Sequence, residues 1–171
     1  MTINCKGKLL NFDSPIVMGI LNVTPDSFYD GGNLSNEDKI IEKANQMLSE
    51  GATILDVGGY SSKPGATEVS EKEEINRVVP AIKSILSQFP DAILSVDTFR
   101  SSVAREAVNA GASIINDISA GDLDKSMFAT VRQLQVPYCI MHIQGNPKTM
   151  QQNPNYQNVV TEVFYSLSKK V

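Results

Sequence analysis

The sequence predicts an α/β fold with a parallel sheet of the (β/α)8 TIM-barrel type. Five short apolar runs alternate with five stretches of helical periodicity. The runs are apolar throughout, as expected of strands covered on both faces. Each run stops at a side chain that can hydrogen-bond or ionise: Asn22, Asp56, Asp97, Asn116 and His142. Such a row indicates a ligand site at the carboxyl ends of the strands, in a barrel or in an open doubly wound sheet.

The first part of the chain predicts a hairpin followed by one strand, one loop and one helix. Met1–Phe12 has apolar residues on both sides of a Lys-Gly pair, which indicates a small hairpin. The strand is expected at Ile16–Leu21, and the Pro-, Gly- and Asp-rich segment Val23–Asn33 is expected to be a loop. Helical periodicity then runs from a cap at Ser35 to Gly51.

The second unit repeats this order. Thr53–Leu55 is an apolar run, and Val57–Ala66 is a second loop rich in Gly, Ser and Pro. Ser70 and Glu73 have the spacing of a capping box, which predicts a helix from there to about Gln88.

Two further units complete the pattern. Strands are expected at Ala92–Val96 and Ala112–Ile115, separated by a helix that Thr98 caps and Gly111 ends. Because a crossover helix joins two parallel strands, their carboxyl ends meet at one edge of the sheet. Asp97 should therefore stand beside Asn116, and a carboxylate beside an amide can bind a flat heterocycle that carries donors and acceptors.

The last part of the chain predicts a helix around residues 127–134, a strand at Pro137–Met141 and a final amphipathic helix around residues 159–167. Ile143–Asn155 is expected to be a third polar loop. Cys139 lies within the apolar run and is expected to be buried in the core.

Composition narrows the class of partner. The net charge is −4 and the pI is about 5.0, which argues against nucleic acid or an anionic membrane surface as the main partner. The two cysteines indicate no disulfide framework, and no apolar stretch is long enough to span a membrane. We therefore expect one soluble domain over residues 1–171, located in the cytoplasm.

Several loops resemble those of the dihydropteroate synthase family. The resemblance rests on MGILNVTPDSFYDGG at residues 18–32, the loop at 57–66, SVDT at 95–98, IINDI at 114–118 and MHIQGNPKTMQ at 141–151. This family forms a (β/α)8 barrel of folate biosynthesis and is a sulfonamide target. It joins 6-hydroxymethyl-7,8-dihydropterin pyrophosphate to 4-aminobenzoate, which gives dihydropteroate and pyrophosphate.

The resemblance implies roles for individual residues. Residues implied to bind the pterin are Asp97, Asn116, Ile118 and Asp56. Residues implied to contact 4-aminobenzoate are Phe28, Ser62 and Pro64. Asp30 and Lys63 are implied to lie at the reacting centre. Asn22 is implied to bind Mg²⁺ at the pyrophosphate, and a single neutral amide suits this role because Mg²⁺ takes few protein oxygens.

The resemblance also sets expectations about departures from the family. The second loop has Tyr60, Ser62 and Lys63 where the family commonly has Glu, Thr and Arg. A complete barrel needs about 250 residues, so strands six to eight are expected to be missing. We therefore expect the chain alone to be inactive or nearly so. The resemblance separately implies that the full-length family enzyme is a homodimer.

Two other functions are consistent with parts of the pattern. A methyltetrahydrofolate-dependent methyltransferase domain has the same fold and a similar Asp/Asn contact with a pterin. The loops at residues 18–32 and 141–151 favour the synthase over it. A non-catalytic half-barrel fragment is the third alternative. His142, the single histidine, has either an ordering role or a direct role at the site.

Overall fold

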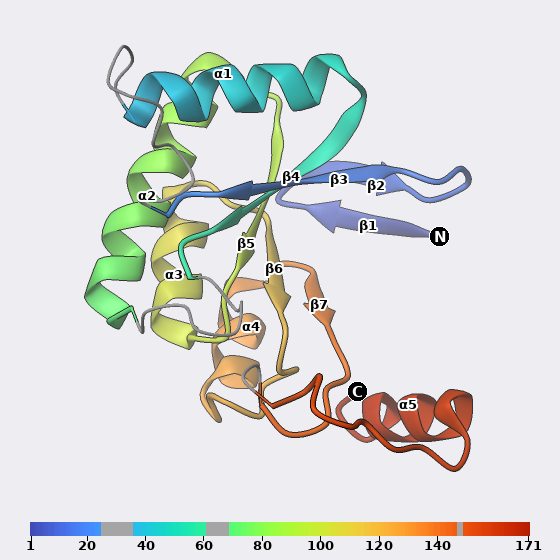
Figure 1. Cartoon of the computed structure of the whole chain (residues 1–171). Helices are drawn as coiled ribbons and strands as arrows, with labels where there is room; N and C mark the ends of the chain where they lie inside the picture. Colours follow the sequence, from blue (N-terminus) through green and yellow to red (C-terminus); the bar gives the residue numbers. More distant parts are fainter. Residues whose placement is uncertain (25–35, 61–68, 147–148) are drawn as a thin grey trace.

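A computed structural model describes residues 1–24, 36–60, 69–146 and 149–171. Its centre is a sheet of five parallel strands whose order in space follows their order in the chain (Figure 1). The strands are β3 (Val17–Asn22), β4 (Ala52–Gly58), β5 (Ile93–Asp97), β6 (Ile114–Asp117) and β7 (Tyr138–Ile140). A doubly wound sheet reverses its order partway, so the sequential order supports the barrel-type prediction.

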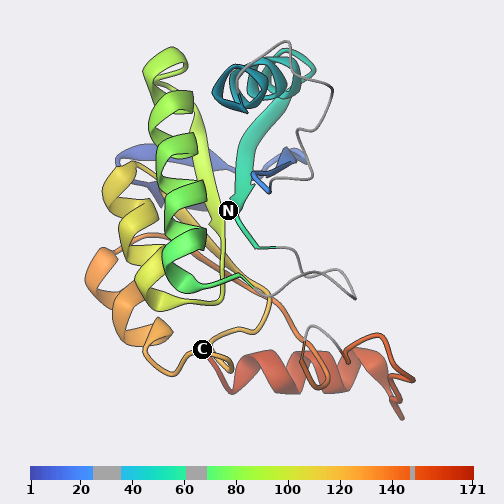
Figure 2. The same cartoon turned by 60° about the vertical axis from the view of Figure 1, so that its left-hand side comes forward.

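The helices alternate with the strands as the periodicity predicted. They are α1 (Asn36–Ser49), α2 (Glu71–Gln88), α3 (Ser101–Ala110), α4 (Met127–Leu134) and α5 (Val159–Ser168). Helices α1 to α4 cover one face of the sheet (Figures 1 and 2). Ser70 caps α2 as predicted, because its hydroxyl accepts a hydrogen bond from the backbone N–H of Glu73 at 3.2 Å.

Two separate apolar cores lie on the two faces of the sheet. On the helix side, Leu55, Val57 and Leu94 are fully buried among residues of α2 and α3. The opposite face, called the inner face below, carries the alternate residues of each strand. There the predicted hairpin, formed by β1 (Thr2–Cys5) and β2 (Lys8–Asn11), packs on Ile54 and Ile114 and covers the part of the face near the amino ends of the strands.

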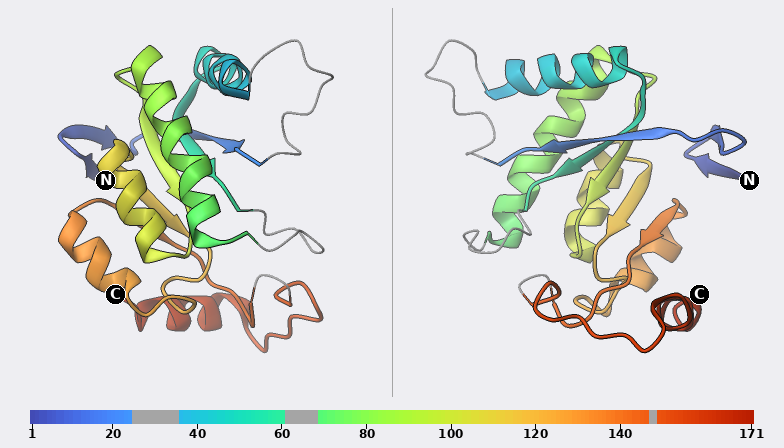
Figure 3. Two further views of the ribbon diagram at one scale, coloured as in Figure 1. Left: turned by 90° about the vertical axis from the view of Figure 1, so that its left-hand side faces the viewer. Right: turned by 45° about the vertical axis from the view of Figure 1, so that its right-hand side comes forward.

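Exposed apolar side chains lie on the inner face toward the carboxyl ends of the strands and on the last helix. Ile20 on β3 is 65% exposed, and Phe164 on α5 is 74% exposed. Helix α5 lies beyond the carboxyl end of the sheet, apart from the layer of α2, α3 and α4 (Figure 3). Among the described residues, no helix is both long and apolar enough to cross a membrane.

Three local predictions were wrong. Strand β4 continues past Asp56 to Gly58, because it stays paired with β3 and β5 over those residues. Thr98 does not cap α3, since that helix begins at Ser101, whose backbone N–H donates to Asp124 Oδ2 at 2.7 Å. Cys139 is exposed, because the pleat of β7 turns it to the inner face beside Asn116.

Two glycines that end helices offer a matched test of packing. Gly51 and Gly111 both adopt positive φ, at 105° and 124°. A Cβ at Gly111 would lie 2.3 Å from Leu86 Cδ1, whereas one at Gly51 would meet nothing within 4 Å. We expect Gly111→Ala to lower the free energy of unfolding by about 1–2 kcal/mol more than Gly51→Ala does. Urea unfolding of both variants measures this difference, and equal losses would show that Leu86 moves aside without cost.

Candidate functional site

The carboxyl ends of four strands bring the predicted polar residues together. Strand pairing aligns Asn22 with Gly58, Gly58 with Asp97, and Asp97 with Asn116. These residues form one row across the sheet on the inner face, with Asp56 two positions deeper on β4. The prediction that Asp97 and Asn116 lie side by side is therefore confirmed.

Gly58 leaves open space in this row between two of the predicted site residues. A side chain there would begin 3.5 Å from Asn22 Oδ1 and 3.5 Å from Asp97 Oδ2. The side-chain oxygens of Asn22 and Asp97 are thus directed toward the same space. From the sequence, Gly58 was expected only in a loop, although the Gly-Gly pair after a strand could have indicated a close approach to ligand.

The Asp97 carboxyl group is held in an unfavourable electrostatic environment. Burial raises its pKa to about 7, and the negative charges of Asp56, Glu74 and Asp117 add to the shift. Among the described residues, no donor forms a hydrogen bond with this carboxylate. The Asp97 side chain is half-buried, so a carboxylate without a partner is costly there, and it lies where a ligand with N–H groups could satisfy it.

Asp56 and Asn116 are joined directly. The side-chain amide Nδ2 of Asn116 donates a hydrogen bond to Asp56 Oδ2 at 2.8 Å. Burial raises the pKa of Asp56, and the neighbouring Ser95 hydroxyl and Asn116 amide partly offset that shift. Asp56 Oδ1 and Ser95 Oγ are both buried, and neither forms a hydrogen bond of standard length and angle within the described part of the chain.

Asp117 shapes the turn that follows β6. Its carboxylate is fully buried and accepts hydrogen bonds from Ser119 N, Ser119 Oγ, Gly121 N and the Tyr138 hydroxyl, at 2.6–2.8 Å. Burial and this carboxylate both raise the pKa of Tyr138. Successive residues of β6 point to opposite faces, so the Asn116 side chain lies on the inner face while Asp117 makes the turn contacts. Ile118 follows at the same strand end, half-buried.

A buried ion pair supports the same edge of the sheet. Glu74 on α2 is fully buried; its Oε1 accepts from Thr98 Oγ1 at 2.7 Å, and its Oε2 pairs with Arg100. Burial raises the pKa of Glu74, an effect that Thr98 and Arg100 oppose. Arg100 also donates to the Val69 carbonyl oxygen at 2.8 Å. This network was not predicted, since no short-range sequence pattern links Glu74 to residues more than twenty positions away.

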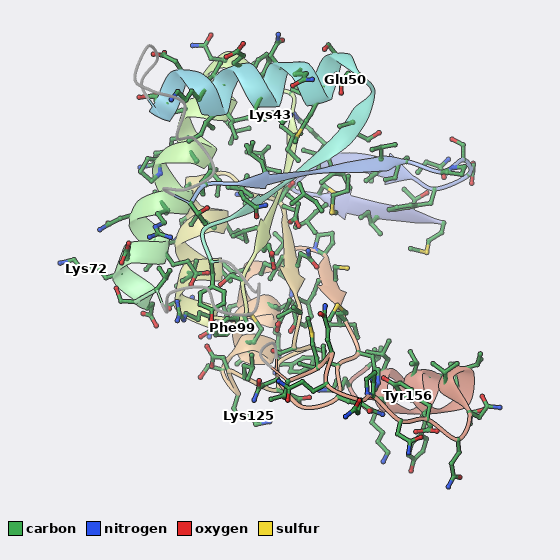
Figure 4. All side chains as sticks on the ribbon, viewed as in Figure 1. Lys43, Glu50, Lys72, Phe99, Lys125 and Tyr156 are labelled. Atoms are coloured by element: carbon green, nitrogen blue, oxygen red, sulfur yellow. The ribbon has the colours of Figure 1, made fainter. Side chains whose placement is uncertain are left out.

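Two aromatic rings extend the network to the end of β4. Phe99 lies at the carboxyl end of the sheet (Figure 4), and its ring meets the Tyr60 ring edge-on with centroids 5.3 Å apart. The Arg100 guanidinium lies over both rings, 5.5 Å from the Tyr60 centroid and 5.0 Å from the Phe99 centroid. These contacts give Tyr60 a packing role at the end of β4.

Some predicted site residues fall outside the described part of the chain. They are Phe28, Asp30, Ser62, Lys63 and Pro64. Their assignment to 4-aminobenzoate and to the reacting centre therefore stays a prediction.

Asn22 offers a single neutral oxygen for a metal ion. Its side chain is exposed, and no group of three or more His, Cys, Asp or Glu side chains among the described residues could hold a metal. The arrangement fits Mg²⁺ only where substrate phosphate and water supply most of the ligands.

His142 contacts the segment before α5. Its Nε2 lies 3.1 Å from the Tyr156 hydroxyl, and its Nδ1 is buried without a hydrogen-bond partner in the described structure. Figure 4 shows Tyr156 next to α5. This contact supports an ordering role for His142.

Comparison with known proteins gives one consistent family. Residues 18–171 match the family described as pterin binding enzyme. Dihydropteroate synthase of Haemophilus influenzae is 46% identical over 170 residues, covering 99% of this chain and 61% of that protein. The chain thus spans about three fifths of the length of this relative.

Solved structures agree with this match. Dihydropteroate synthase of Yersinia pestis, solved with a sulfonamide drug, superimposes with a TM-score of 0.89 at 44% identity, covering 99% of this chain and 61% of that one. The Xanthomonas albilineans enzyme in complex with 7,8-dihydropteroate gives a TM-score of 0.85 at 38% identity, covering 99% and 58%.

Proposed function

Because the chain belongs to the pterin binding enzyme family, we propose that it supplies the pterin-binding edge of a dihydropteroate synthase. The observation that carries this proposal is the pairing of Asp97 with Asn116 across β5 and β6. The proposed reaction joins 6-hydroxymethyl-7,8-dihydropterin pyrophosphate to 4-aminobenzoate. The synthase names of the relatives favour this reaction over methyl transfer from a folate.

The inner face provides contacts suited to one edge of a pterin. When ionised, the Asp97 carboxylate accepts hydrogen bonds from ring N–H and exocyclic NH2 groups, and such charge-assisted bonds are strong and directional. Asn116 lies beside it, and we propose that Ile118 lines the edge of the ring. Asp56 lies deeper and reaches the site through its hydrogen bond with Asn116.

The same residues can assist departure of pyrophosphate. Loss of the leaving group places positive charge on the pterin methylene and ring, and the nearby Asp97 carboxylate would stabilise that charge. Mg²⁺ held in part by Asn22 would neutralise charge on the departing pyrophosphate. We propose that Phe28, Ser62 and Pro64 contact the aminobenzoate, with Asp30 and Lys63 near the reacting carbon.

We also propose a cytoplasmic location, which the free thiols of Cys5 and Cys139 support because reducing compartments keep cysteines unpaired.

A hybrid enzyme tests the proposed activity. This chain would replace the segment of the H. influenzae synthase that it matches, and dihydropteroate formation would be measured from the two substrates. We expect synthesis by the hybrid and a loss of at least 100-fold in the hybrid with Asp97→Ala. A folded hybrid that binds neither substrate would contradict the proposal.

Pterin binding is expected to depend on pH through Asp97. Its raised pKa, about 7, means that the carboxyl group is mostly protonated below neutral pH in the free site. Because the protonated form accepts N–H donors poorly, affinity should rise about tenfold per pH unit below pH 7 and level off above it. Calorimetric titration of the hybrid from pH 5.5 to 8.5 measures this. The Asp97→Asn hybrid should show a flat profile, and an unchanged slope there would assign the titration to another group.

A further inference from the structure

Asp56 and Asn116 occupy two successive levels of the inner face. The pairing of Asp56 with Ser95 places both one level below the row that contains Asp97 and Asn116. Asp56 is 4% exposed and Ser95 is fully buried. The carboxylate of Asp56 therefore lies beneath Asn116 and away from the rim.

The hydrogen bond between them determines which end of the Asn116 amide is free. A side-chain amide has a donor end and an acceptor end, whereas a carboxylate can only accept. The bond from Asn116 Nδ2 to Asp56 Oδ2 therefore uses one of the two N–H groups of the donor end and turns that end toward Asp56. In the described part of the chain, no donor reaches Asn116 Oδ1. The acceptor end is thus available beside the Asp97 carboxylate.

We propose that Asp56 is a positioning residue that holds the Asn116 carbonyl oxygen toward the ligand, so that this edge selects a ring edge made of N–H donors. The inference rests on the proposed function only in taking a pterin as that ligand. A reversed amide would present NH2 beside Asp97 and would favour a ring edge that alternates donor and acceptor. Asp56 acts through Asn116 and makes no contact with the ring itself.

Ser95 belongs to the same arrangement. Asp56 Oδ1 and Ser95 Oγ are the two buried polar atoms of this level that lack a hydrogen-bond partner in the described residues. Ser95 is on β5, between the strands that carry Asp56 and Asn116, and its hydroxyl lowers the pKa of Asp56. A hydrogen bond from Ser95, direct or through one water, would hold this carboxylate from the β5 side and would keep Asp56 Oδ2 aligned with the amide.

The orientation of Asn116 can be tested without any ligand. In a ¹⁵N NMR spectrum of this chain, the Asn116 side-chain NH2 should give two well-separated proton resonances, because only one of its protons bonds to Asp56. Asp56→Asn should shift and broaden this pair, since an amide at position 56 can face Asn116 with either end. Asp91→Asn is the matched control, because Asp91 is fully exposed near the amino ends of the strands. Unchanged Asn116 resonances in Asp56→Asn would overturn the inference.

A double-mutant cycle distinguishes positioning from direct contact. The affinity of this chain and of the hybrid for 6-hydroxymethylpterin would be measured in Asp56→Asn, Asn116→Ala and the double variant. We expect Asp56→Asn alone to weaken binding by about 5- to 20-fold and to add less than about twofold in the Asn116→Ala background. Equal losses in both backgrounds would show direct contact between Asp56 and the ring and would overturn the inference.

The two measurements separate this inference from the proposed function. If neither protein binds a pterin, the proposed function fails, and the NMR result alone decides whether Asp56 orients Asn116. If pterin binds and the cycle is additive, the proposed function stands and the positioning role is wrong.

Discussion

Replacing Asp97 with asparagine is expected to weaken pterin binding by at least 30-fold while making the protein more stable. Two charge-assisted hydrogen bonds to the ring would be lost or weakened, a change of about 2–5 kcal/mol. In the free protein, the same change removes a half-buried carboxylate that has no donor among the described residues and that Asp56, Glu74 and Asp117 repel. Opposite effects on binding and stability are expected of a residue kept for function.

The sign of the stability effect follows from the raised pKa of Asp97. Its folded-state pKa is about 7, above that of an unfolded aspartate, so the folded protein holds the proton more tightly. Its contribution to stability is therefore full below about pH 4 and is lost as pH rises to about 7. Urea unfolding should show a gain on the order of 1–3 kcal/mol for Asp97→Asn at pH 8 and a smaller gain at pH 5. Asp13→Asn, at an exposed position, serves as the control; equal gains at both pH values would contradict this explanation.

Replacing Glu74 with alanine is expected to cost about 3–5 kcal/mol of unfolding free energy, a large share of the stability of an ordinary domain. The substitution leaves the Arg100 guanidinium, whose side chain is only 17% exposed, without its carboxylate. It also removes the acceptor of the Thr98 hydroxyl. Burying an unpaired charge is the main cause of the loss.

Glu73→Ala is the matched control for this prediction. Glu73 precedes Glu74 on α2 and pairs with Arg77, but its side chain is 53% exposed. The Arg77 side chain is itself only 16% exposed, but its carboxylate partner lies largely in water, and Arg77 keeps its hydrogen bond to the Gly59 carbonyl oxygen at 3.0 Å. We therefore expect Glu73→Ala to cost only about 1 kcal/mol. Chemical denaturation of both variants measures the difference. Similar losses for Glu73 and Glu74 would mean that the buried pair has no special role at this edge.

The sequence predicted the fold well where the cause was local. Apolar runs and helix caps placed all five parallel strands to within a few residues, and Ser70 caps α2 as expected. The neighbouring positions of Asp97 and Asn116 followed from the parallel direction of two strands joined by a crossover helix.

The predictions that were wrong or missing depended on contacts between distant parts of the chain. Thr98 looked like a helix cap, but its hydroxyl bonds to Glu74, which lies 24 positions earlier. Cys139 lies in an apolar run, yet its place on the inner face depends on how β7 is paired. The hydrogen bond between Asp56 and Asn116 joins residues 60 positions apart. It depends on how the strands align side by side in the sheet, which the sequence does not give.

A crystal structure of the hybrid with a dihydropterin bound would be the sharpest test of the proposed pterin site. We expect the N–H edge of the ring to lie within about 3 Å of both the Asp97 carboxylate and Asn116 Oδ1, with Asp56 beneath Asn116 and out of contact with the ring. A pterin bound elsewhere, or bound here without contact to Asp97 and Asn116, would show that the site is assigned wrongly.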